Sequence, residues 1–467
     1  MNLKKRLGLA LAAVSFVLIL FLPTSSDLSG VGVRCLALFC AVFFLYLFES
    51  INAAVVSLLI VPALTLLHIV DIQTALSGFA STSTYLIVGS FILAAAVLKS
   101  GLGTRITYLI LMKIGASSRR VTFGILLVNI VTAFMIPSST ARTAMMLPIC
   151  ISLIRQFSSE KHSRFGANLM LTLCITNSTI SAGILTATIS NPMAAEYVLS
   201  STGSSVSFTD WFVWGFPPAL LMTLISWVLI QLFFPPEQAG IKGGKAFIEN
   251  QLRSLGPMGH DEKITVAVLA FTIFLWVCGH IFAIDSTSAC LLGACLLVLP
   301  KIGILKWSDC KNNISVSVVF IVSGGVSLGA AMSSTGASAW IASRIFSLLR
   351  LQSMSPFLLI VTLIIIVQFM HIFFAGTATM ANVFFPILIG IAATAGLPAG
   401  QLLIPAAFMI GGYPILMFFN TTPSIMCYDT GEVSAGDFPK IGFVISVIAC
   451  AVYALCAFVY WPLTGLL

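Results

Sequence analysis

The chain has 467 residues, of which 59% are hydrophobic and only 8% are charged, and its formal net charge is +8. Charged residues make up about 25% of a typical soluble protein, so this composition excludes a soluble globular domain and indicates a polytopic membrane protein. The basic residues lie in short loops. Their positive charge therefore argues against nucleic acid as a partner and fits the excess of Lys and Arg on the cytoplasmic side of membrane proteins.

The first predicted transmembrane helix lies within residues 1–30. Lys4, Lys5 and Arg6 precede its apolar run, as in a signal peptide, but no cleavage site made of small residues stands out. We therefore expect an uncleaved helix whose N-terminus is cytoplasmic.

Residues 31–234 form a first predicted repeat. Its apolar run after residue 120 is interrupted by a Pro-Ser-Ser-Thr corner and resumes as a second helical arm, so we expect a re-entrant hairpin at 121–156. A bilayer tolerates non-helical backbone only where protein or water satisfies its N–H and C=O groups. The corner therefore predicts a site that is lined by water or by a ligand. The alternative is an ordinary proline kink.

The chemistry of this corner follows from its residue types. Ser138, Ser139 and Thr140 place hydroxyls and unpaired amides at a helix N-terminus, which favours an anion, while unwound carbonyl groups can hold a small cation. Arg142 follows them deep in an apolar segment. We expect it either to supply a fixed positive charge or to tie carbonyl groups within the hairpin. A later helix of the same repeat is interrupted at Asn191 and Pro192, and we place both in the substrate site.

Residues 235–263 are predicted to form a cytoplasmic loop, and residues 264–467 to form a second repeat with the same order of parts. Its hairpin is expected at 357–395, with Gly376, Thr377 and Thr379 at the tip. A following helix breaks at residues that we also place in the substrate site: Thr421, Thr422 and Pro423.

The two repeats together predict the topology. Each holds five crossings, an odd number, so the second repeat must be inverted relative to the first. We expect an all-α polytopic membrane protein with about 11 transmembrane helices, two re-entrant hairpins and the C-terminus outside. Inverted repeats with paired broken helices are typical of secondary transporters that bind substrate near the middle of the bilayer.

Several other classes are disfavoured. The 15 Asp and Glu residues are expected at segment ends or in loops, which argues against a proton pump with acidic residues inside the membrane. No HExxH motif and no Ser/His pair indicates catalysis, so we do not expect an enzyme. The eleven cysteines fall mostly within apolar runs without metal-binding spacing, and we expect them to be core side chains and no metal site to depend on them.

Several motifs carry a resemblance to a known family. They are SGFASTSTYLIVGSFILAAAVLKSGLGTRI (77–106), IPSSTARTAMMLPI (136–149), SNPMAAEYV (190–198), HIFFAGTATMANVFFPI (371–387) and DTGEVSAGDFPKIGFVISV (429–447). The chain resembles the divalent anion/sodium symporter (DASS) superfamily along nearly its whole length. The likeness is greatest to the branch of citrate/succinate and 2-oxoglutarate/malate antiporters.

The resemblance implies a scaffold and a transport unit that moves past it as an elevator. It also implies assembly as a homodimer and a location in the cell (inner) membrane. It implies that substrate carboxylates contact both hairpin tips, and it makes sodium a candidate ion near Ser138, Thr140 and Thr377, with no other cofactor. Both tips depart from the family's Ser-Asn-Thr pattern, since Ser139 replaces Asn and the second tip carries Gly376 and Ala378.

We therefore expect a secondary active transporter of di- or tricarboxylates (a C4-dicarboxylate, citrate or 2-oxoglutarate) that works as an antiporter. Its partners would be a small anionic substrate and the lipid bilayer. One alternative is a sodium-coupled symporter of an inorganic oxyanion such as sulfate. Another is a membrane receptor or channel on the same fold.

Overall fold

The computed structural model describes residues 3–25, 27–157, 163–237, 243–348 and 354–467, and in these ranges it contains helices and no strands. This confirms the predicted all-α class. A helix satisfies its backbone hydrogen bonds internally, which long apolar runs in lipid require. Eight of the described helices are long and apolar enough to span a membrane: 30–47, 82–100, 118–135, 208–233, 316–334, 356–373, 377–395 and 437–464. The expected total of about 11 crossings stays a prediction.

The N-terminal part packs α1 (Leu3–Leu20) against α2 (Gly30–Leu47), followed by α3 (Ala53–Leu66), α4 (Ile72–Ala75), η1 (Ser77–Ala80) and α5 (Thr82–Ser100). The approach of α1 to the turn between α2 and α3 is very close. A Cβ at Gly8 would collide with the side chains of Phe48 and Ser50. The N-terminal end of α1 is therefore held beside this turn.

The first hairpin follows α6 (Leu102–Ile114) and consists of α7 (Ser118–Met135) and α8 (Ser139–Phe157), with the non-helical residues 136–138 between them. It packs on α9 (Arg164–Ser181), every residue of which from Phe165 onward is buried. After an irregular segment at 182–189 the chain continues as α10 (Ser190–Thr202) and α11 (Phe208–Phe233).

The connection between the two halves contains a helix that the sequence analysis did not predict. Helix α12 (Gly244–Ser254) is amphipathic, buries Ile248 and packs against α6. Arg105 of α6 donates to the carbonyl oxygens of Leu255, Gly256 and Pro257 just after it, at 3.0 to 3.3 Å. The described residues of the connection are thus folded onto the first half.

The second half begins with α13 (His260–Val277), α14 (Gly279–Phe282), α15 (Ser286–Val298), α16 (Trp307–Asn313), α17 (Val316–Ser334) and α18 (Ala337–Leu348). The second hairpin consists of α19 (Pro356–Met370), the turn η3 (His371–Phe373) and α20 (Thr377–Ala395). The chain then forms α21 (Gly400–Gly412), α22 (Thr422–Tyr428), α23 (Asp437–Leu455), the π-helical turn η4 (Cys456–Tyr460) and α24 (Trp461–Thr464).

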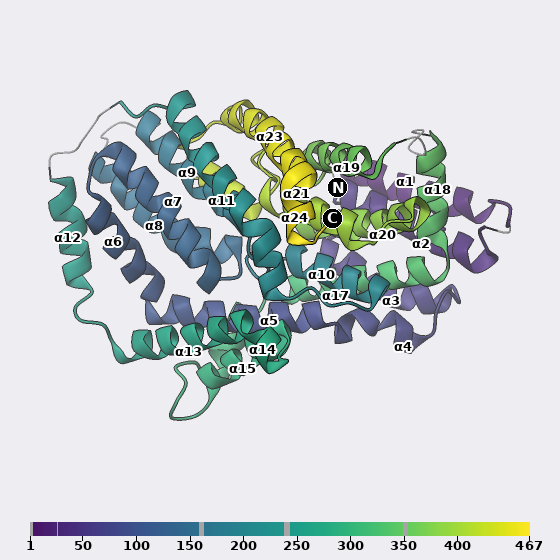
Figure 1. Cartoon of the computed structure of the whole chain (residues 1–467), viewed down its shortest axis with the longest axis horizontal. Coiled ribbons are helices and arrows are strands. Elements are labelled where there is room, and N and C mark those ends of the chain that lie inside the picture. Colours follow the sequence, from purple (N-terminus) through teal and green to yellow (C-terminus); the bar gives the residue numbers. More distant parts are fainter. Residues whose placement is uncertain (1–2, 26, 158–162, 238–242, 349–353) are drawn as a thin grey trace.

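The two hairpins lie in different parts of the molecule and point toward a common centre. Figure 1 shows α7, α8 and α9 on one side, α17, α18 and α20 on the other, and α21 and α23 between them. Helix α17 packs on α3 and also on α20 and α10. This close packing depends on small residues, because a Cβ at Gly325 would collide with Asn382 of α20 and one at Gly329 with Tyr197 of α10.

Candidate functional site

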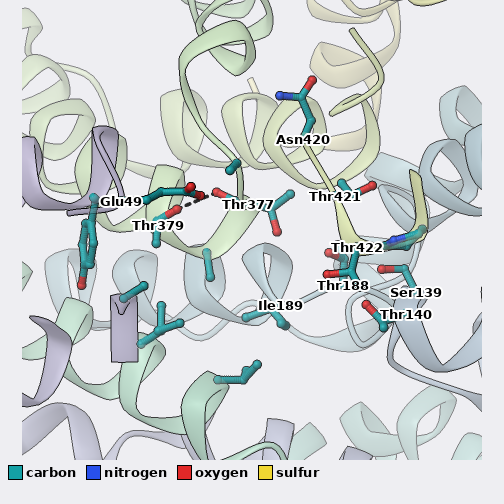
Figure 2. A pocket seen from close by; sticks show the side chains of 18 of the residues that line it. Glu49, Ser139, Thr140, Thr188, Ile189, Thr377, Thr379, Asn420, Thr421 and Thr422 are labelled. Atoms are coloured by element: carbon teal, nitrogen blue, oxygen red, sulfur yellow. Dashed lines mark hydrogen bonds between the residues drawn. The ribbon is translucent and has the colours of Figure 1, made fainter. Parts of the chain in front are cut away.

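A cavity of about 560 Å³ lies where the two hairpin tips and the two interrupted helices meet. Its size falls in the range of small-molecule sites. Figure 2 shows residues of the first tip on one side and of the second tip on the other, with the segment before α22 between them. The predicted site residues that line the cavity are Ser138, Ser139, Thr140, Gly376, Thr377, Thr379, Thr421, Thr422 and Pro423.

At the first tip, α8 begins directly at the cavity. The Ser138 hydroxyl oxygen accepts a hydrogen bond from the Ala141 backbone N–H at 3.2 Å and so caps the helix. The hydroxyls of Ser139 and Thr140 make no hydrogen bond to another described residue. They are therefore free to bind a ligand at the positive end of the α8 dipole.

The second tip has a similar arrangement with different residues. Gly376 is the N-cap of α20 and offers no side chain to its free N–H groups. The Thr379 hydroxyl donates to the Gly376 carbonyl oxygen at 2.8 Å, whereas the Thr377 hydroxyl has no hydrogen-bond partner among the described residues. The N-terminal amides of α20 and the Thr377 hydroxyl thus face the cavity unpaired.

The interrupted helices complete the walls. Thr188 and Ile189 line the cavity just before α10, and Asn420 does so just before α22. The Asn420 amide donates to the carbonyl oxygens of His371 and Phe374 at 2.6 and 3.0 Å. These hydrogen bonds connect the interruption before α22 to the second hairpin. The site is therefore assembled from four separate stretches of chain.

Arg142 does not line the cavity. It is fully buried behind the first tip, where its Nε donates to Asn177 Oδ1 at 2.7 Å and its Nη1 donates to the carbonyl oxygens of Ile136 at 2.6 Å and Ala187 at 3.2 Å. Its Nη2 donates to the Ser181 hydroxyl and to the Asn177 carbonyl oxygen. No carboxylate pairs with Arg142 in the described part of the chain, so uncharged oxygen atoms surround a buried positive charge.

Asn191 and Pro192 also lie outside the main cavity. Asn191 Nδ2 donates to the carbonyl oxygens of Ser181 and Ile184, both at 2.9 Å, and so satisfies the unwound end of α9. Pro192 lines a narrow adjoining space of about 20 Å³ that also touches Ser138. These two residues shape the break in the backbone and do not face the main cavity.

A buried histidine stands behind the second tip. His371 is 1% exposed, and its two ring nitrogens contact the carbonyl oxygens of Gln368 and Ile410 at 3.1 and 3.2 Å. Like Arg142, it therefore bridges one hairpin and the interrupted helix beside it. The described residues contain no group of three or more His, Cys, Asp or Glu residues that could hold a metal ion.

Sequence reasoning missed several residues that line the cavity. Ser178 and Thr188 lie in polar interruptions of an apolar run, which was a usable signal. Lys5 comes from α1, Tyr46 from the end of α2, and Glu49 and Asn52 from the turn between α2 and α3; no local pattern marks these residues. Lys5 and Glu49 are the charged residues among those that line the cavity.

Comparisons with known proteins agree with this architecture. The chain is 26% identical to the sodium-dependent dicarboxylate transporter SdcS of Staphylococcus saprophyticus, over 99% of this chain and 92% of that protein. It is 24% identical to dicarboxylate transporter 1, chloroplastic, of Spinacia oleracea, over 96% of this chain and 80% of that protein. Its fold is similar to that of the Alcanivorax borkumensis YdaH transporter, with a TM-score of 0.56 at 10% identity, over 83% of this chain and 87% of that one.

The family match includes both hairpins and both interrupted helices. Residues 3–467 match the family described as the sodium:sulfate symporter transmembrane region. The chain therefore belongs to this family, which confirms the divalent anion/sodium symporter membership that its motifs predicted.

Proposed function

We propose that the protein is a secondary active transporter that exchanges di- or tricarboxylates across the cell (inner) membrane. The observation that carries the proposal is the buried guanidinium of Arg142 among oxygen atoms of Ile136, Asn177, Ser181 and Ala187, with no carboxylate partner among the residues that the structure describes. Carbonyl and hydroxyl oxygens are the ligands that a sodium ion takes in transporters of this kind of architecture. The guanidinium of Arg142 occupies a position of this kind, and it supplies a positive charge there without a bound sodium ion.

The cavity fits a small dianion. Free hydroxyls and helix N-termini at the two tips offer hydrogen bonds to two separate carboxylate groups. The tips themselves carry no acidic side chain, so they do not repel an anion. Two relatives are named as dicarboxylate transporters, which supports the same substrate class.

In the proposed mechanism the two hairpins move together with the interrupted helices past a scaffold that includes α2, α3 and α17. Residues 31–234 and 264–467 would be the two inverted repeats, joined by a cytoplasmic connection. The N-terminus would face the cytoplasm, the C-terminus would lie outside, and two copies would form a homodimer. Binding and movement are the whole reaction, because no covalent bond changes.

Counterflow into proteoliposomes tests this proposal. Vesicles are loaded with succinate, malate or citrate, labelled succinate is supplied outside, and sodium buffer is compared with potassium buffer. Uptake that requires an internal carboxylate and is equal in the two buffers is the expected result. Sodium-dependent uptake into empty vesicles would contradict exchange and favour a symporter, and labelled sulfate in the same assay tests the oxyanion alternative. Binding without any flux would indicate a receptor.

The Arg142→Gln variant tests the role of the buried charge. We expect it to lose sodium-independent exchange, since the remaining oxygen atoms then need a cation. Arg253→Gln is the matched control, because Arg253 is exposed on α12 and pairs with Glu249 of the same helix. Exchange that is unchanged in Arg142→Gln would contradict the role assigned to this residue.

A further inference from the structure

The mouth of the cavity is charged, unlike its centre. Lys5 of α1 and Glu49 of the turn after α2 both line the cavity and both are exposed to solvent. The packing of α1 at Gly8 against Phe48 and Ser50 holds these two residues near one another. Neither residue belongs to a hairpin, so the charges reach the site from a different part of the fold.

Glu49 lies on the side of the second tip. In Figure 2 Glu49 lies on the same side of the view as Thr377 and Thr379, whereas Ser139 and Thr140 lie on the opposite side of the cavity that all of them line. A dicarboxylate bound between the two tips therefore places one carboxylate far from Glu49 and the other nearer to it. A third carboxylate has to point toward the mouth, since the two tips are already occupied.

The ion pair of Glu49 does not remove its charge from the cavity. Lys4 Nζ approaches Glu49 Oε2 only to 4.0 Å, and the two side chains are 61% and 54% exposed. Such exposed pairs are weak, because water screens the two charges. Glu49 therefore has no close ion-pair partner among the described residues, and it lies beside tips that otherwise attract anions.

We infer that Glu49 is a specificity-determining residue that favours dicarboxylates over tricarboxylates. This inference rests on the proposed function and narrows its substrate class. The repulsion between Glu49 and a bound anion grows with the charge of that anion, because Coulomb energy is proportional to the product of the charges. Lys5 acts in the opposite sense and keeps the mouth attractive to a dianion.

The backbone conformation at Glu49 allows the carboxylate to be removed without strain in the turn. Glu49 has φ +48°, and the bonds from Glu49 N to Tyr46 O and from Ser50 N to Leu45 O form the Schellman pattern that ends α2. Glycine is the favoured residue at this position. Glu49→Gly therefore removes the carboxylate and relieves the turn, while Glu49→Gln removes only the charge.

The experiment measures calorimetric binding of succinate and of citrate to the purified full-length protein, at a pH where citrate is fully ionised. Sodium and potassium buffers are both used, so that the result does not depend on the mode of coupling. We expect both Glu49 variants to bind succinate about threefold more tightly and citrate about fivefold or more, with smaller gains at high salt. Lys5→Gln should weaken binding of both anions.

Two control variants separate a direct effect of charge from loss of a structural tie. Lys4→Gln removes the partner of Glu49 and should not raise affinity, and Glu249→Gln removes a half-buried carboxylate on α12, outside the cavity, and should change nothing. Wild-type binding with an unchanged citrate to succinate ratio in both Glu49 variants overturns the inference alone. Lys4→Gln that reproduces Glu49→Gln also overturns it. If neither anion binds to the wild type or to either Glu49 variant, the proposed function fails together with the inference.

Discussion

Arg142 and Asn177 are joined from Nε to Oδ1 at 2.7 Å, and the Asn177 amide nitrogen donates in turn to the Ser139 carbonyl oxygen at 2.8 Å. Asn177 also donates to the Thr143 hydroxyl at 2.8 Å. One fully buried carboxamide therefore links the buried charge to the first hairpin tip.

The Asn177→Ala variant should be strongly destabilised, by about 3 kcal/mol, because a buried guanidinium loses one of its oxygen acceptors. A lowered midpoint of thermal unfolding in detergent, together with weaker succinate binding, is the expected result. The control is Asn312→Ala, since Asn312 is exposed on α16. Equal stability of the two variants would contradict the coupling.

Thr140→Val and Thr377→Val test the two tips as equivalent half-sites. Each change removes one hydroxyl and preserves the shape of the side chain, so we expect succinate affinity to fall about three- to tenfold with little change in stability. Calorimetric binding and thermal unfolding measure the two effects separately. Thr394→Val is the control, because its hydroxyl donates to the Gly390 carbonyl oxygen within α20, away from the tip. Normal affinity in either tip variant would remove that residue from the site.

Glu196 joins α10 to the start of α5. Its Oε2 accepts hydrogen bonds from the Thr82 hydroxyl at 2.6 Å and from the Ser83 backbone N–H at 3.0 Å. In the proposed cycle α10 moves relative to α5, so this contact has to break. Glu196→Gln should speed exchange and lower thermal stability by about 1 kcal/mol, since a charge-assisted bond becomes a neutral one. Thr82→Val should show a smaller change in the same direction, and slower exchange in Glu196→Gln would contradict this role.

The pair Arg105–Glu262 predicts a pH dependence. Arg105 Nε lies 2.6 Å from Glu262 Oε1, and the two side chains are only 11% and 9% exposed. The hydrogen bond from Arg105 holds the pKa of Glu262 below its usual value, with a further contribution from the Gly259 N–H and against the effect of burial. The stability that this pair contributes is therefore present above the pKa of the unfolded carboxyl, about 4.3, and is lost as the pH falls through the lower folded value.

Glu262→Gln should accordingly lower the free energy of unfolding by about 2 kcal/mol at neutral pH, and its difference from the wild type should shrink as the pH falls below about 4. Unfolding of both proteins across this pH range measures the effect. The more exposed pair of Arg253 and Glu249, whose side chains are 74% and 33% exposed, provides the control, because Glu249→Gln should change stability by less than about 0.5 kcal/mol. A difference that does not vary with pH would contradict the assignment.

The hairpins could be predicted because polar breaks interrupt long apolar runs, and such breaks are rare in lipid. The position of Arg142 along the first hairpin could also be predicted from the sequence. The direction of its side chain could not be predicted, because the rotation of α8 about its own axis depends on how α8 packs against α9. Arg142 points to the carbonyl groups of the interrupted helix and away from the cavity.

Glu49 and Lys5 could not be predicted as cavity residues for a different reason. They lie in chain order far from both hairpins, and only the tertiary packing of α1 and α2 brings them to the mouth. Helix α12 was missed because its sequence is mostly polar and only Gly244 and Ile248 are buried. A search for long apolar runs does not detect a short amphipathic helix within a polar connection.

The buried charge of Arg142 has a consequence for how transport responds to voltage. In the proposed cycle the guanidinium travels with the first hairpin and cannot dissociate as a sodium ion can. A loaded unit with a dianion then carries one net negative charge, and an empty unit carries one net positive charge. Moving one elementary charge through the membrane field involves about 2.3 kcal/mol per 100 mV. Exchange of two dianions cancels this work over a full cycle, so the membrane potential would neither drive nor oppose net exchange.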